Sequence, residues 1–276
     1  MRDTLPSGLP FMKMHGLGND FVVVDARHGD VNLTSKLVQA LADRHRGVGF
    51  DQLAVISEGD DITITFYNAD GSTSAACGNA TRCIAARELD LRQAESLTIQ
   101  ITGRGTLHAV RRDDGVTAVN MGHPQLTWQD IPLAQDVDLL ALPIDGAPVA
   151  TGMGNPHCTF FVEDVEAVDL AEYGPRIEYH PLFPQRTNVQ FAQVIGPDHI
   201  RMRVWERGTG ITLASGSSSC AVAVAAVRKG LCGRSVRMEL DGGLLQIDWR
   251  DDGVWMAGPT AHVFDGVLTQ SFLDSL

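Results

Sequence analysis

The sequence predicts an α+β fold of two pseudo-symmetric domains, each a curved, mostly antiparallel sheet or barrel around a central helix. Three observations predict it. The 276 residues are enough for two domains with cores of their own. Two Ala-rich apolar stretches, 77–91 and 217–229, are typical of buried helices. Short alternating segments, typical of strands, surround each stretch in a similar order.

A short motif accompanies each of the two predicted helices. The first copy reads FYNADG and then ACGN, and the second reads VWERG and then ASGS. The polar residue after the aromatic one, Asn68 or Glu206, precedes Cys77 or Ser215 by nine positions in each copy. We interpret the two copies as two half-sites built in the same way, with a thiol in one and a hydroxyl in the other.

In the first half, alternating segments predict strands and one further segment predicts a helix. Helical spacing covers 33–45, with Thr34 as the N-cap. Residues 1–10 contain Pro and Gly and are expected to form a flexible leader. The expected strands cover 11–15, 21–25, 53–56, 62–67, 96–102, 105–111 and 116–121.

The second half repeats this order after a boundary at which prolines and polar residues interrupt the periodicity. We expect an N-terminal half of residues 11–122 that also takes up the tail 266–276, and a C-terminal half of residues 123–265. A short helix is expected at 169–172, and Gly230 ends the second buried helix. The expected strands cover 149–151, 157–162, 187–192, 199–205, 235–240, 243–250 and 253–258.

Composition excludes several classes of function. The formal net charge of −12 disfavours nucleic acid and anionic membranes as partners. No apolar run reaches the roughly 18 residues of a membrane span, and no secretory signal is visible. The five cysteines form no close pair, which favours reduced thiols in a cytoplasmic protein. No phosphate-binding or dinucleotide motif and no metal-ligand spacing stands out, so we expect neither cofactor nor metal.

Cys77 is the first candidate for chemistry. It precedes Gly78 at a predicted helix N-terminus, where the helix dipole and free N–H groups favour a reactive thiolate and can bind a carboxylate. A buried structural cysteine is the alternative. Two facing thiols would suit inversion of an α-carbon, since one removes a proton and the other delivers one to the opposite face. Ser215 is a poor proton acceptor, and helix capping is its alternative role.

Amide and charged side chains form the second group of candidates. Five Asn residues lie in distinctive short motifs, and Asn amides bind both ammonium and carboxylate groups, as an amino acid substrate requires. Arg207 is expected to bind a carboxylate, and Glu206 to bind an ammonium or tune position 215. His157 is expected to orient or polarise Cys77, although a lone His is more often structural. The Asn residues are Asn19, Asn68, Asn79, Asn155 and Asn188.

Together these motifs closely resemble the diaminopimelate epimerase family. The motifs KMHGLGNDFVVVD, GVGFDQL, FYNADGS, ACGNATRC, GMGNPHC, RTNVQF and VWERGTG follow in the family's order, from about residue 11 to 264. The resemblance implies a cofactor-independent isomerase that interconverts LL- and meso-diaminopimelate in lysine and peptidoglycan precursor synthesis. It also implies a cytoplasmic homodimer, with the substrate in the cleft between two similar α/β domains.

The same resemblance assigns roles to individual residues. Cys77 matches one catalytic thiol, Ser215 occupies the position of the second, and His157 and Glu206 match residues that assist them. Ile211 and Ala80 replace an acidic residue and a glycine that are frequent in the family, and we interpret both as tolerated. The positions that match substrate-binding residues are Asn19, Gln52, Asn68, Gly78, Asn79, Asn155, Asn188, Glu206, Arg207, Gly216 and Ser217.

Three interpretations of Ser215 remain open. The chain is an engineered inactive form, a natural relative with altered chemistry, or a copy that only binds its ligand. Retention of every binding motif favours the first, because drift after loss of activity erodes such motifs. The alternatives in function are a racemase or epimerase of another amino acid, such as histidine or a hydroxyproline, and a non-catalytic amino acid binding protein.

Overall fold

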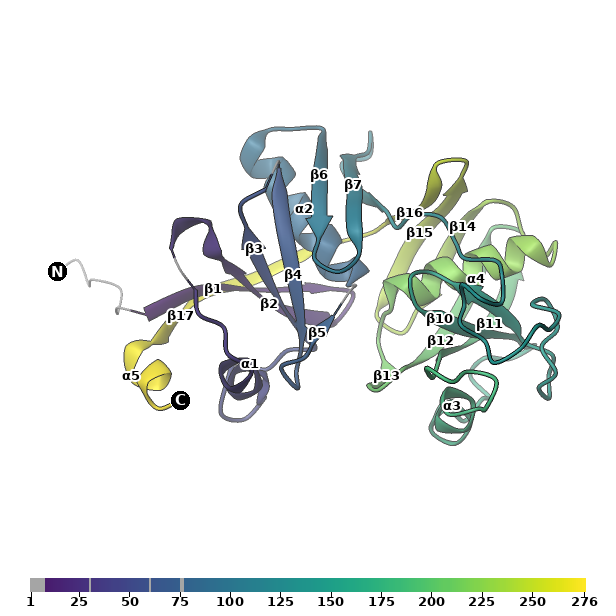
Figure 1. The fold of residues 1–276 in the computed structure, drawn as a ribbon. Coiled ribbons are helices and arrows are strands. Elements are labelled where there is room, and N and C mark those ends of the chain that lie inside the picture. Colours follow the sequence, from purple (N-terminus) through teal and green to yellow (C-terminus); the bar gives the residue numbers. More distant parts are fainter. Residues whose placement is uncertain (1–7, 30, 60, 75–76) are drawn as a thin grey trace. The chain divides into compact units, whose positions relative to one another are not determined.

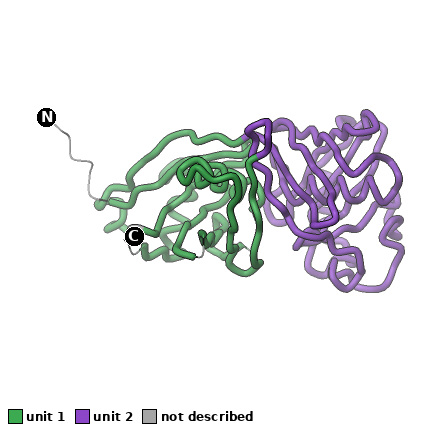
Figure 2. Tube along the Cα trace, turned by 90° about the horizontal axis from the view of Figure 1, so that it is seen from above, with its two compact units in different colours: residues 1–111, 260–276 green, residues 112–259 purple. Residues whose placement is uncertain are grey.

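The computed structural model describes residues 8–29, 31–59, 61–74 and 77–276, and the chain forms two compact units. Unit 1 comprises residues up to Arg111 together with Thr260–Leu276, and unit 2 comprises Arg112–Pro259 (Figure 2). The first boundary therefore precedes the one expected at residue 122, and the C-terminal segment returns to unit 1 earlier than expected. The boundary precedes residue 122 because strand 117–120 pairs with strand 253–257 of unit 2.

Unit 1 contains eight strands and four helical segments among its described residues (Figure 1). The strands are β1 (Gly8–Gly16), β2 (Asn19–Asp25), β3 (Gln52–Ser57), β4 (Ile62–Asn68), β5 (Thr73–Ser74), β6 (Ser96–Ile101), β7 (Gly105–Arg111) and β17 (Ala261–Thr269). The helices are η1 (Ala26–His28), α1 (Ser35–Ala42), α2 (Gly78–Arg92) and α5 (Gln270–Asp274).

Unit 2 contains the remaining elements. Its strands are β8 (Thr117–Asn120), β9 (Val149–Gly152), β10 (Pro156–Phe161), β11 (Asn188–Gly196), β12 (His199–Glu206), β13 (Gly210–Thr212), β14 (Ser235–Leu240), β15 (Gly243–Arg250) and β16 (Gly253–Ala257). Its helices are α3 (Leu170–Glu178) and α4 (Gly216–Arg228).

The two sheets have the same topology, which agrees with the repeated order of elements that the sequence predicts. In unit 1 the order β1-β2-β3-β4-β6-β7 alternates antiparallel and parallel pairs. In unit 2 the order β9-β10-β11-β12-β14-β15 alternates in the same way. The short strands β5 and β13 pair with β4 and β12 in an antiparallel manner at equivalent places. The predicted α+β fold of two similar, mostly antiparallel units is therefore confirmed, and the parallel pairs make each sheet a mixed one.

Each sheet packs around one buried helix, as the sequence predicts. Helix α2 contacts β1, β2, β6 and β7, and helix α4 contacts β9, β10, β11, β14, β15 and β16 (Figure 1). Ala85 of α2 and Ala225 of α4 are fully buried. Small side chains let the strands approach the helix closely on all sides, which explains the Ala-rich composition of both helices.

A second apolar layer covers each sheet. In unit 1, Leu37, Val38 and Leu41 of α1 pack with Phe11 and Leu268 from the sheet. In unit 2, Leu170 of α3 joins a core that includes Ile131, Leu133 and Leu142. The proline-rich stretch after residue 122 therefore contributes buried apolar side chains to unit 2 and is not a linker.

The observed elements correct several expectations from local pattern. Strand β1 begins at Gly8, so residues 8–10 of the expected leader are part of the sheet, and residues 1–7 lie outside the described residues. Strand β17, which the sequence did not indicate, pairs with this segment from Gly8↔Thr269 onward. Helix α1 is shorter than the predicted 33–45, and α3 is longer than the predicted 169–172.

Candidate functional site

Cys77 and Ser215 occupy the same structural position in the two units. Each is the N-cap residue of a buried helix, has extended backbone dihedrals and makes no side-chain capping bond. Oγ1 of Thr81 donates to the carbonyl of Cys77 at 2.9 Å, and Oγ of Ser219 donates to that of Ser215 at 2.8 Å. Both N-cap side chains therefore lie beside first-turn N–H groups that have no partner within the helix. Gly78, Asn79, Gly216 and Ser217 form these first turns.

We define the unit 1 half-site as Asn19, Gln52, Asn68, Cys77 and Asn79. Asn19 is its centre, since its Oδ1 lies 3.9 Å from Sγ of Cys77 and accepts from Nδ2 of Asn79 at 3.2 Å. Nδ2 of Asn19 donates to Oδ2 of Asp51 at 2.8 Å. Contacts at both ends of the amide fix the orientation of Asn19 towards the thiol.

Asp51 and Arg82 support this half-site and were not predicted as site residues. Asp51 also accepts from Arg44 at 2.9 Å, so its carboxylate is held by a guanidinium. Arg82 is fully buried in α2 and donates to Oδ1 of Asn79 at 2.9 Å. A charged residue within an apolar helical stretch was the available signal for Arg82, since a buried charge requires polar partners.

Gly16 lies where β1 passes the first turn of α2. A Cβ at this position would lie 2.9 Å from Nη2 of Arg82 and 3.1 Å from Cβ of Asn79. The glycine in the HGLGND motif therefore permits a close approach of strand and helix. The absence of a side chain here, more than backbone freedom, explains why a glycine fits this position.

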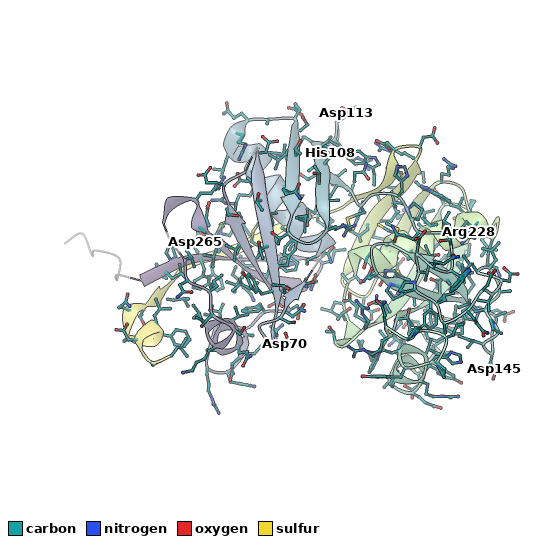
Figure 3. The ribbon with its side chains drawn as sticks, viewed as in Figure 1. Asp70, His108, Asp113, Asp145, Arg228 and Asp265 are labelled. Atoms are coloured by element: carbon teal, nitrogen blue, oxygen red, sulfur yellow. The ribbon has the colours of Figure 1, made fainter. Side chains whose placement is uncertain are left out.

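Asn68, the last residue of β4, and Gln52, the first residue of β3, are cross-strand neighbours. Nε2 of Gln52 contacts Oδ1 of Asn68 at 3.3 Å, and Nδ2 of Asn68 donates to Oγ of Ser72 at 3.0 Å. Asp70, labelled in Figure 3, accepts from Oγ of Ser72 at 2.6 Å and from its backbone N–H at 2.9 Å, and these two hydrogen bonds, the first above all, lower the pKa of Asp70. The FYNADGS motif thus forms a tight turn that holds the Asn68 amide.

We define the unit 2 half-site as Asn155, His157, Asn188, Glu206 and Ser215. Its most direct contact joins Oγ of Ser215 to Oε2 of Glu206 at 2.7 Å. The second carboxylate oxygen, Oε1, accepts from Oγ1 of Thr212 on β13 at 2.6 Å. The sequence predicted the link between positions 206 and 215, whereas Thr212 carried no signal of its own.

A buried carboxylate from α3 holds the turn after Glu206. Glu178 is 2% exposed and accepts from the backbone N–H of Gly208 at 2.9 Å and from Nε1 of Trp205 at 2.7 Å. Oδ1 of Asn188 accepts from the backbone N–H of Arg207 at 3.0 Å. These contacts fix the backbone that carries Glu206 and Arg207. Nothing local in the sequence pointed to Glu178.

Arg207 is a cation without an acidic partner within 4 Å among the described residues of its unit. Its guanidinium donates to the carbonyl of Gln185 at 3.1 Å. Burial lowers its pKa, the positive charge of Arg186 lowers it further, and Glu178 opposes both effects. A half-buried guanidinium of this kind is suited to bind a carboxylate.

His157 is fully buried and neutral, because burial, assisted by the charge of Arg207, lowers its pKa to about 3. Its Nε2 contacts Oδ1 of Asn155 at 2.8 Å, and its Nδ1 contacts Nε2 of Gln190 at 3.0 Å. An amide N–H₂ is a donor, so Gln190 fixes the tautomer in which Nε2 carries the proton. Both ring nitrogens are therefore engaged within unit 2. The expected action of His157 on Cys77 stays a prediction.

The two half-sites are equivalent by strand register. Asn19 and Asn155 each lie two residues before a residue that pairs with Gln52 or Asn188 on the parallel neighbour. Asn68 and Glu206 end the next strands, β4 and β12. The same framework thus presents a neutral amide before the thiol and a carboxylate before the hydroxyl.

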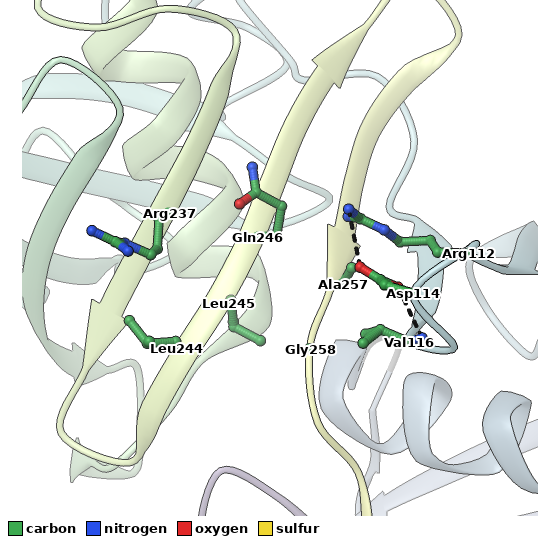
Figure 4. A pocket seen from close by; sticks show the side chains of 9 residues that line it. All are labelled: Arg112, Asp114, Val116, Arg237, Leu244, Leu245, Gln246, Ala257 and Gly258. Carbon is green, nitrogen blue, oxygen red and sulfur yellow. Dashed lines mark hydrogen bonds and ion pairs between the residues drawn. The ribbon is translucent and has the colours of Figure 1, made fainter.

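Two pockets within the units lie away from these residues. A pocket of about 250 Å³ in unit 2 lies beside β14, β15 and β16, where Arg112 pairs with Asp114 at 3.4 Å (Figure 4). A second pocket of about 440 Å³ in unit 1 lies beside Leu9 and Leu273. No predicted site residue lines either pocket.

Metal sites and membrane-spanning helices are absent from the part of the chain that the structure describes. No group of three or more His, Cys, Asp or Glu side chains there could hold a metal ion. No described helix has the length and apolar character that a membrane span requires. Cys83, Cys158 and Cys220 are buried, and burial raises the pKa of Cys83 to about 11, so they suit structural roles.

Comparison with known proteins gives a consistent family. A family model described as diaminopimelate epimerase matches residues 11–127 and 149–263. The diaminopimelate epimerase of Rhodospirillum centenum is 52% identical over 272 residues, which cover 95% of this chain and 93% of the relative. That of Acidiphilium cryptum is 50% identical over 272 residues, covering 96% of this chain and 98% of the relative.

Solved structures with little sequence identity share the fold. A predicted epimerase from Pseudomonas aeruginosa superposes with a TM-score of 0.67 at 18% identity, covering 94% of this chain and 99% of the other. A hydroxyproline epimerase from Agrobacterium vitis gives a TM-score of 0.61 at 14% identity, covering 94% and 91%. These similarities concern the architecture alone.

Proposed function

The chain belongs to the diaminopimelate epimerase family of isomerases, and from this premise we propose how its residues act on LL- and meso-2,6-diaminopimelate. We propose that the two half-sites act on opposite faces of one α-carbon. The unit 1 half-site supplies Cys77 as the proton donor or acceptor on one face. The unit 2 half-site holds the other face, where position 215 is a serine. Lysine and peptidoglycan precursor synthesis follow from the family.

The geometry around Cys77 supports its role. The thiol lies at the N-terminus of α2, where the helix dipole favours negative charge, both of a thiolate and of a substrate carboxylate. Asn19 and Asn79 present amide groups beside it, and Asp51 fixes their arrangement. His157, neutral and hydrogen-bonded at both nitrogens, orients Asn155 for contact with the substrate.

The surroundings of Arg207 are the observation that best supports the proposed binding of an amino acid. Its guanidinium is half-buried and has no carboxylate within 4 Å among the described residues of unit 2, so a substrate carboxylate completes its interactions. The amides of Asn68, Gln52 and Asn188, with the first-turn groups of Gly216 and Ser217, contribute the remaining polar contacts in this proposal. No cofactor or metal enters it.

Ser215 is proposed to impair turnover relative to a two-thiol enzyme. A serine hydroxyl by itself is a weak proton acceptor and a slow donor at neutral pH, whereas a thiol titrates near neutrality. Loss of one positioned acid or base costs about 10²–10⁴ in rate. We therefore expect slow epimerisation together with retained binding of the substrate.

A homodimer in the cytoplasm completes the proposal. Val263 and Phe264 are neighbouring apolar residues on β17, 53% and 47% exposed, and they are candidates for the contact between two copies. The proposed partner is diaminopimelate, with neither nucleic acid nor membrane. Sedimentation of the unchanged chain and of Phe264→Glu would test the dimer. An unchanged chain that stays monomeric at all concentrations would exclude it.

The variant Ser215→Cys tests the proposed function. With LL- or meso-diaminopimelate as substrate, we expect it to interconvert the stereoisomers about 10²–10⁴ times faster than the unchanged chain with Ser215. The variant Cys77→Ala in the same background is the matched control and should be inactive. Failure of Ser215→Cys with diaminopimelate, together with racemisation of histidine or a hydroxyproline, would assign a different substrate. Binding of meso-diaminopimelate by calorimetry without any turnover would favour a binding protein.

A further inference from the structure

Four polar side chains form a buried cluster where strands β10 and β11 face the first turn of α4. Gln190 on β11 is its centre, because its Oε1 accepts from Oγ1 of Thr159 at 3.2 Å and its Nε2 donates to Oγ of Ser218 at 3.0 Å. The same Nε2 lies 3.0 Å from Nδ1 of His157. All four residues are fully buried. The amide of Gln190 is therefore hydrogen-bonded at both ends within unit 2.

The equivalent positions in unit 1 carry apolar side chains. The equivalence follows from the register of β2 with β3 and of β10 with β11, and from the first residues of α2 and α4. The unit 1 side chains are also fully buried, so the fold is built there without polar groups. Burying polar groups costs free energy that apolar side chains avoid, so the adjacent half-site explains the cluster better than the fold does. His157, Thr159, Gln190 and Ser218 correspond to Phe21, Val23, Ala54 and Ala80, in that order.

The cluster gives a direction to the hydrogen bonds that lead from it to the half-site. Nε2 of Gln190 bears hydrogen and donates to Nδ1 of His157, which is therefore the unprotonated ring nitrogen. Burial lowers the pKa of His157 to about 3, so the neutral ring carries its single proton on Nε2 and donates it to Oδ1 of Asn155 at 2.8 Å. Asn155 is only partly buried, and its Nδ2 has no hydrogen-bond partner among the described residues of unit 2. Asn155 thus presents a free N–H₂ donor.

Asn19, the equivalent of Asn155 in unit 1, has the opposite orientation. Its Nδ2 donates to Asp51 at 2.8 Å, and its Oδ1 accepts from Asn79 at 3.2 Å. The amide of Asn79 is oriented in turn by Arg82, which donates to its Oδ1 at 2.9 Å. An ionised carboxylate only accepts hydrogen bonds and a guanidinium only donates them, so the charged groups at both ends fix this direction. Asn19 presents a carbonyl oxygen at the place where Asn155 presents an amide nitrogen.

We propose that Gln190 is a positioning residue that sets the direction of the hydrogen bonds through His157 and thereby makes Asn155 a donor towards the substrate. An N–H₂ donor recognises a group that accepts hydrogen bonds, which in an amino acid is the carboxylate. The inference rests on the proposed function, since it requires an amino acid substrate. It goes further, because it assigns the free N–H₂ of Asn155 to a carboxylate and names a buried residue that decides this orientation.

Reversal of the direction would change what the half-site recognises. With a proton on Nδ1 of His157, Nε2 becomes an acceptor, and Asn155 has to turn its N–H₂ towards the ring. The carbonyl oxygen of Asn155 then faces the substrate in place of the donor. A carbonyl oxygen cannot donate to a carboxylate and repels its negative charge, so affinity for the substrate falls.

The position of the ring proton tests the direction without any ligand. At a pH of about 8.5, where carboxylic acids are ionised, ¹⁵N NMR of histidine-labelled protein distinguishes a protonated ring nitrogen from an unprotonated one. We expect the proton of His157 on Nε2 in the unchanged chain. In Gln190→Glu we expect it on Nδ1, because an ionised carboxylate accepts a hydrogen bond and donates none. Gln193→Glu is the matched control. It adds the same charge to the same strand, where Gln193 accepts from the backbone N–H of Val165, and should leave the proton on Nε2.

Binding of meso-diaminopimelate, measured by calorimetry at the same pH, is the second readout. Gln190→Glu should bind about 10- to 100-fold more weakly than the unchanged chain, because the donor to the carboxylate is lost, and Gln193→Glu should bind as the unchanged chain does. Asn155→Asp should lose a similar factor while keeping the ring proton on Nε2, since its carboxylate accepts from His157 as the amide oxygen does. Asn155 is partly exposed, so this variant tests the direction even if Gln190→Glu does not fold.

Three results would overturn the role of Gln190. They are an unchanged chain with the ring proton on Nδ1, a folded Gln190→Glu variant with Nδ1 unprotonated, and unaltered affinity in Gln190→Glu or Asn155→Asp. Failure of the proposed function looks different, because an unchanged chain that does not bind meso-diaminopimelate contradicts that function. The ring proton, measured without ligand, still decides in that case whether Gln190 sets the direction.

Discussion

Nδ2 of Asn19 donates to Oδ2 of Asp51 at 2.8 Å, which leaves Oδ1 of Asn19 facing Sγ of Cys77 at 3.9 Å. Asp51 comes directly before the site residue Gln52, yet its own side chain acts on a strand more than thirty residues away. The position of the amide beside the thiol thus depends on a carboxylate that need not touch the substrate.

Replacing Asp51 by Ala should lower kcat/KM by about 10- to 100-fold, because small displacements of positioned groups are costly in catalysis. Exchange of the α-hydrogen on the Cys77 face reports the effect directly. Asp43→Ala is the matched control, since Asp43 accepts hydrogen bonds only near the end of α1, and its activity should equal that of the unchanged chain. Equal rates for both variants would show that Asp51 does not position Asn19.

Gly16→Ala should disturb the contact of β1 with α2. The new Cβ meets Arg82 and Asn79 at 2.9 and 3.1 Å, so strand or helix has to move. Overpacking of this kind costs about 1–3 kcal/mol in the free energy of unfolding, and activity should fall with it. Gly29→Ala adds the same atom where nothing lies within 4 Å and should change stability by less than about 0.5 kcal/mol. Urea titrations of both variants provide the measurement.

Glu178→Ala should both destabilise unit 2 and weaken substrate binding. Its buried carboxylate holds Gly208 and Trp205, and removal leaves their donors unsatisfied, at a cost of about 2–4 kcal/mol. The displaced turn carries Arg207, so KM should rise. Glu172 lies on the same helix with its side chain 61% exposed, and its pair with Arg176 contributes about 0.3–0.5 kcal/mol. Similar losses from Glu172→Ala and Glu178→Ala would contradict the proposed role.

His157 should make stability depend on pH. Its pKa is lowered to about 3 in the folded chain and is about 6.5 in an unfolded one, so the unfolded state binds more protons at low pH. The stability is complete above pH 6.5 and is lost progressively as the pH falls from 6.5 towards 3. Between pH 7.5 and 5.5 the free energy of unfolding should fall by about 1 kcal/mol from this residue.

Urea unfolding at the two pH values checks this prediction. His157→Gln should lose that part of the pH dependence, whatever its effect on stability at pH 7.5. His108, an exposed residue on β7 (Figure 3), supplies the control His108→Gln, which should keep it. An unchanged pH dependence in His157→Gln would mean that the imidazole is not held neutral.

Local pattern predicted the elements that carry the site. Apolar periodicity predicted the two Ala-rich helices, their N-cap residues and most strands. The spacing of apolar residues along the chain is a local signal, and it matches the side chains that a helix or strand buries. The link between Ser215 and Glu206 also followed from the repeated spacing of nine residues. Strand β17 was missed because its pairing with Gly8–Pro10 joins opposite ends of the chain, which no local window includes.

The sequence by itself determined that this chain has two equivalent half-sites, that one begins with Cys77 and the other with Ser215, and that it is related to an epimerase family. Only the tertiary structure decided which distant groups hold those residues. Asp51 on Asn19, Glu178 on the turn after Glu206, and Gln190 on His157 are contacts between separate elements. Such contacts depend on strand register and helix packing, which bring together residues that lie far apart in the chain. The local sequence around each residue does not indicate which distant residue it contacts.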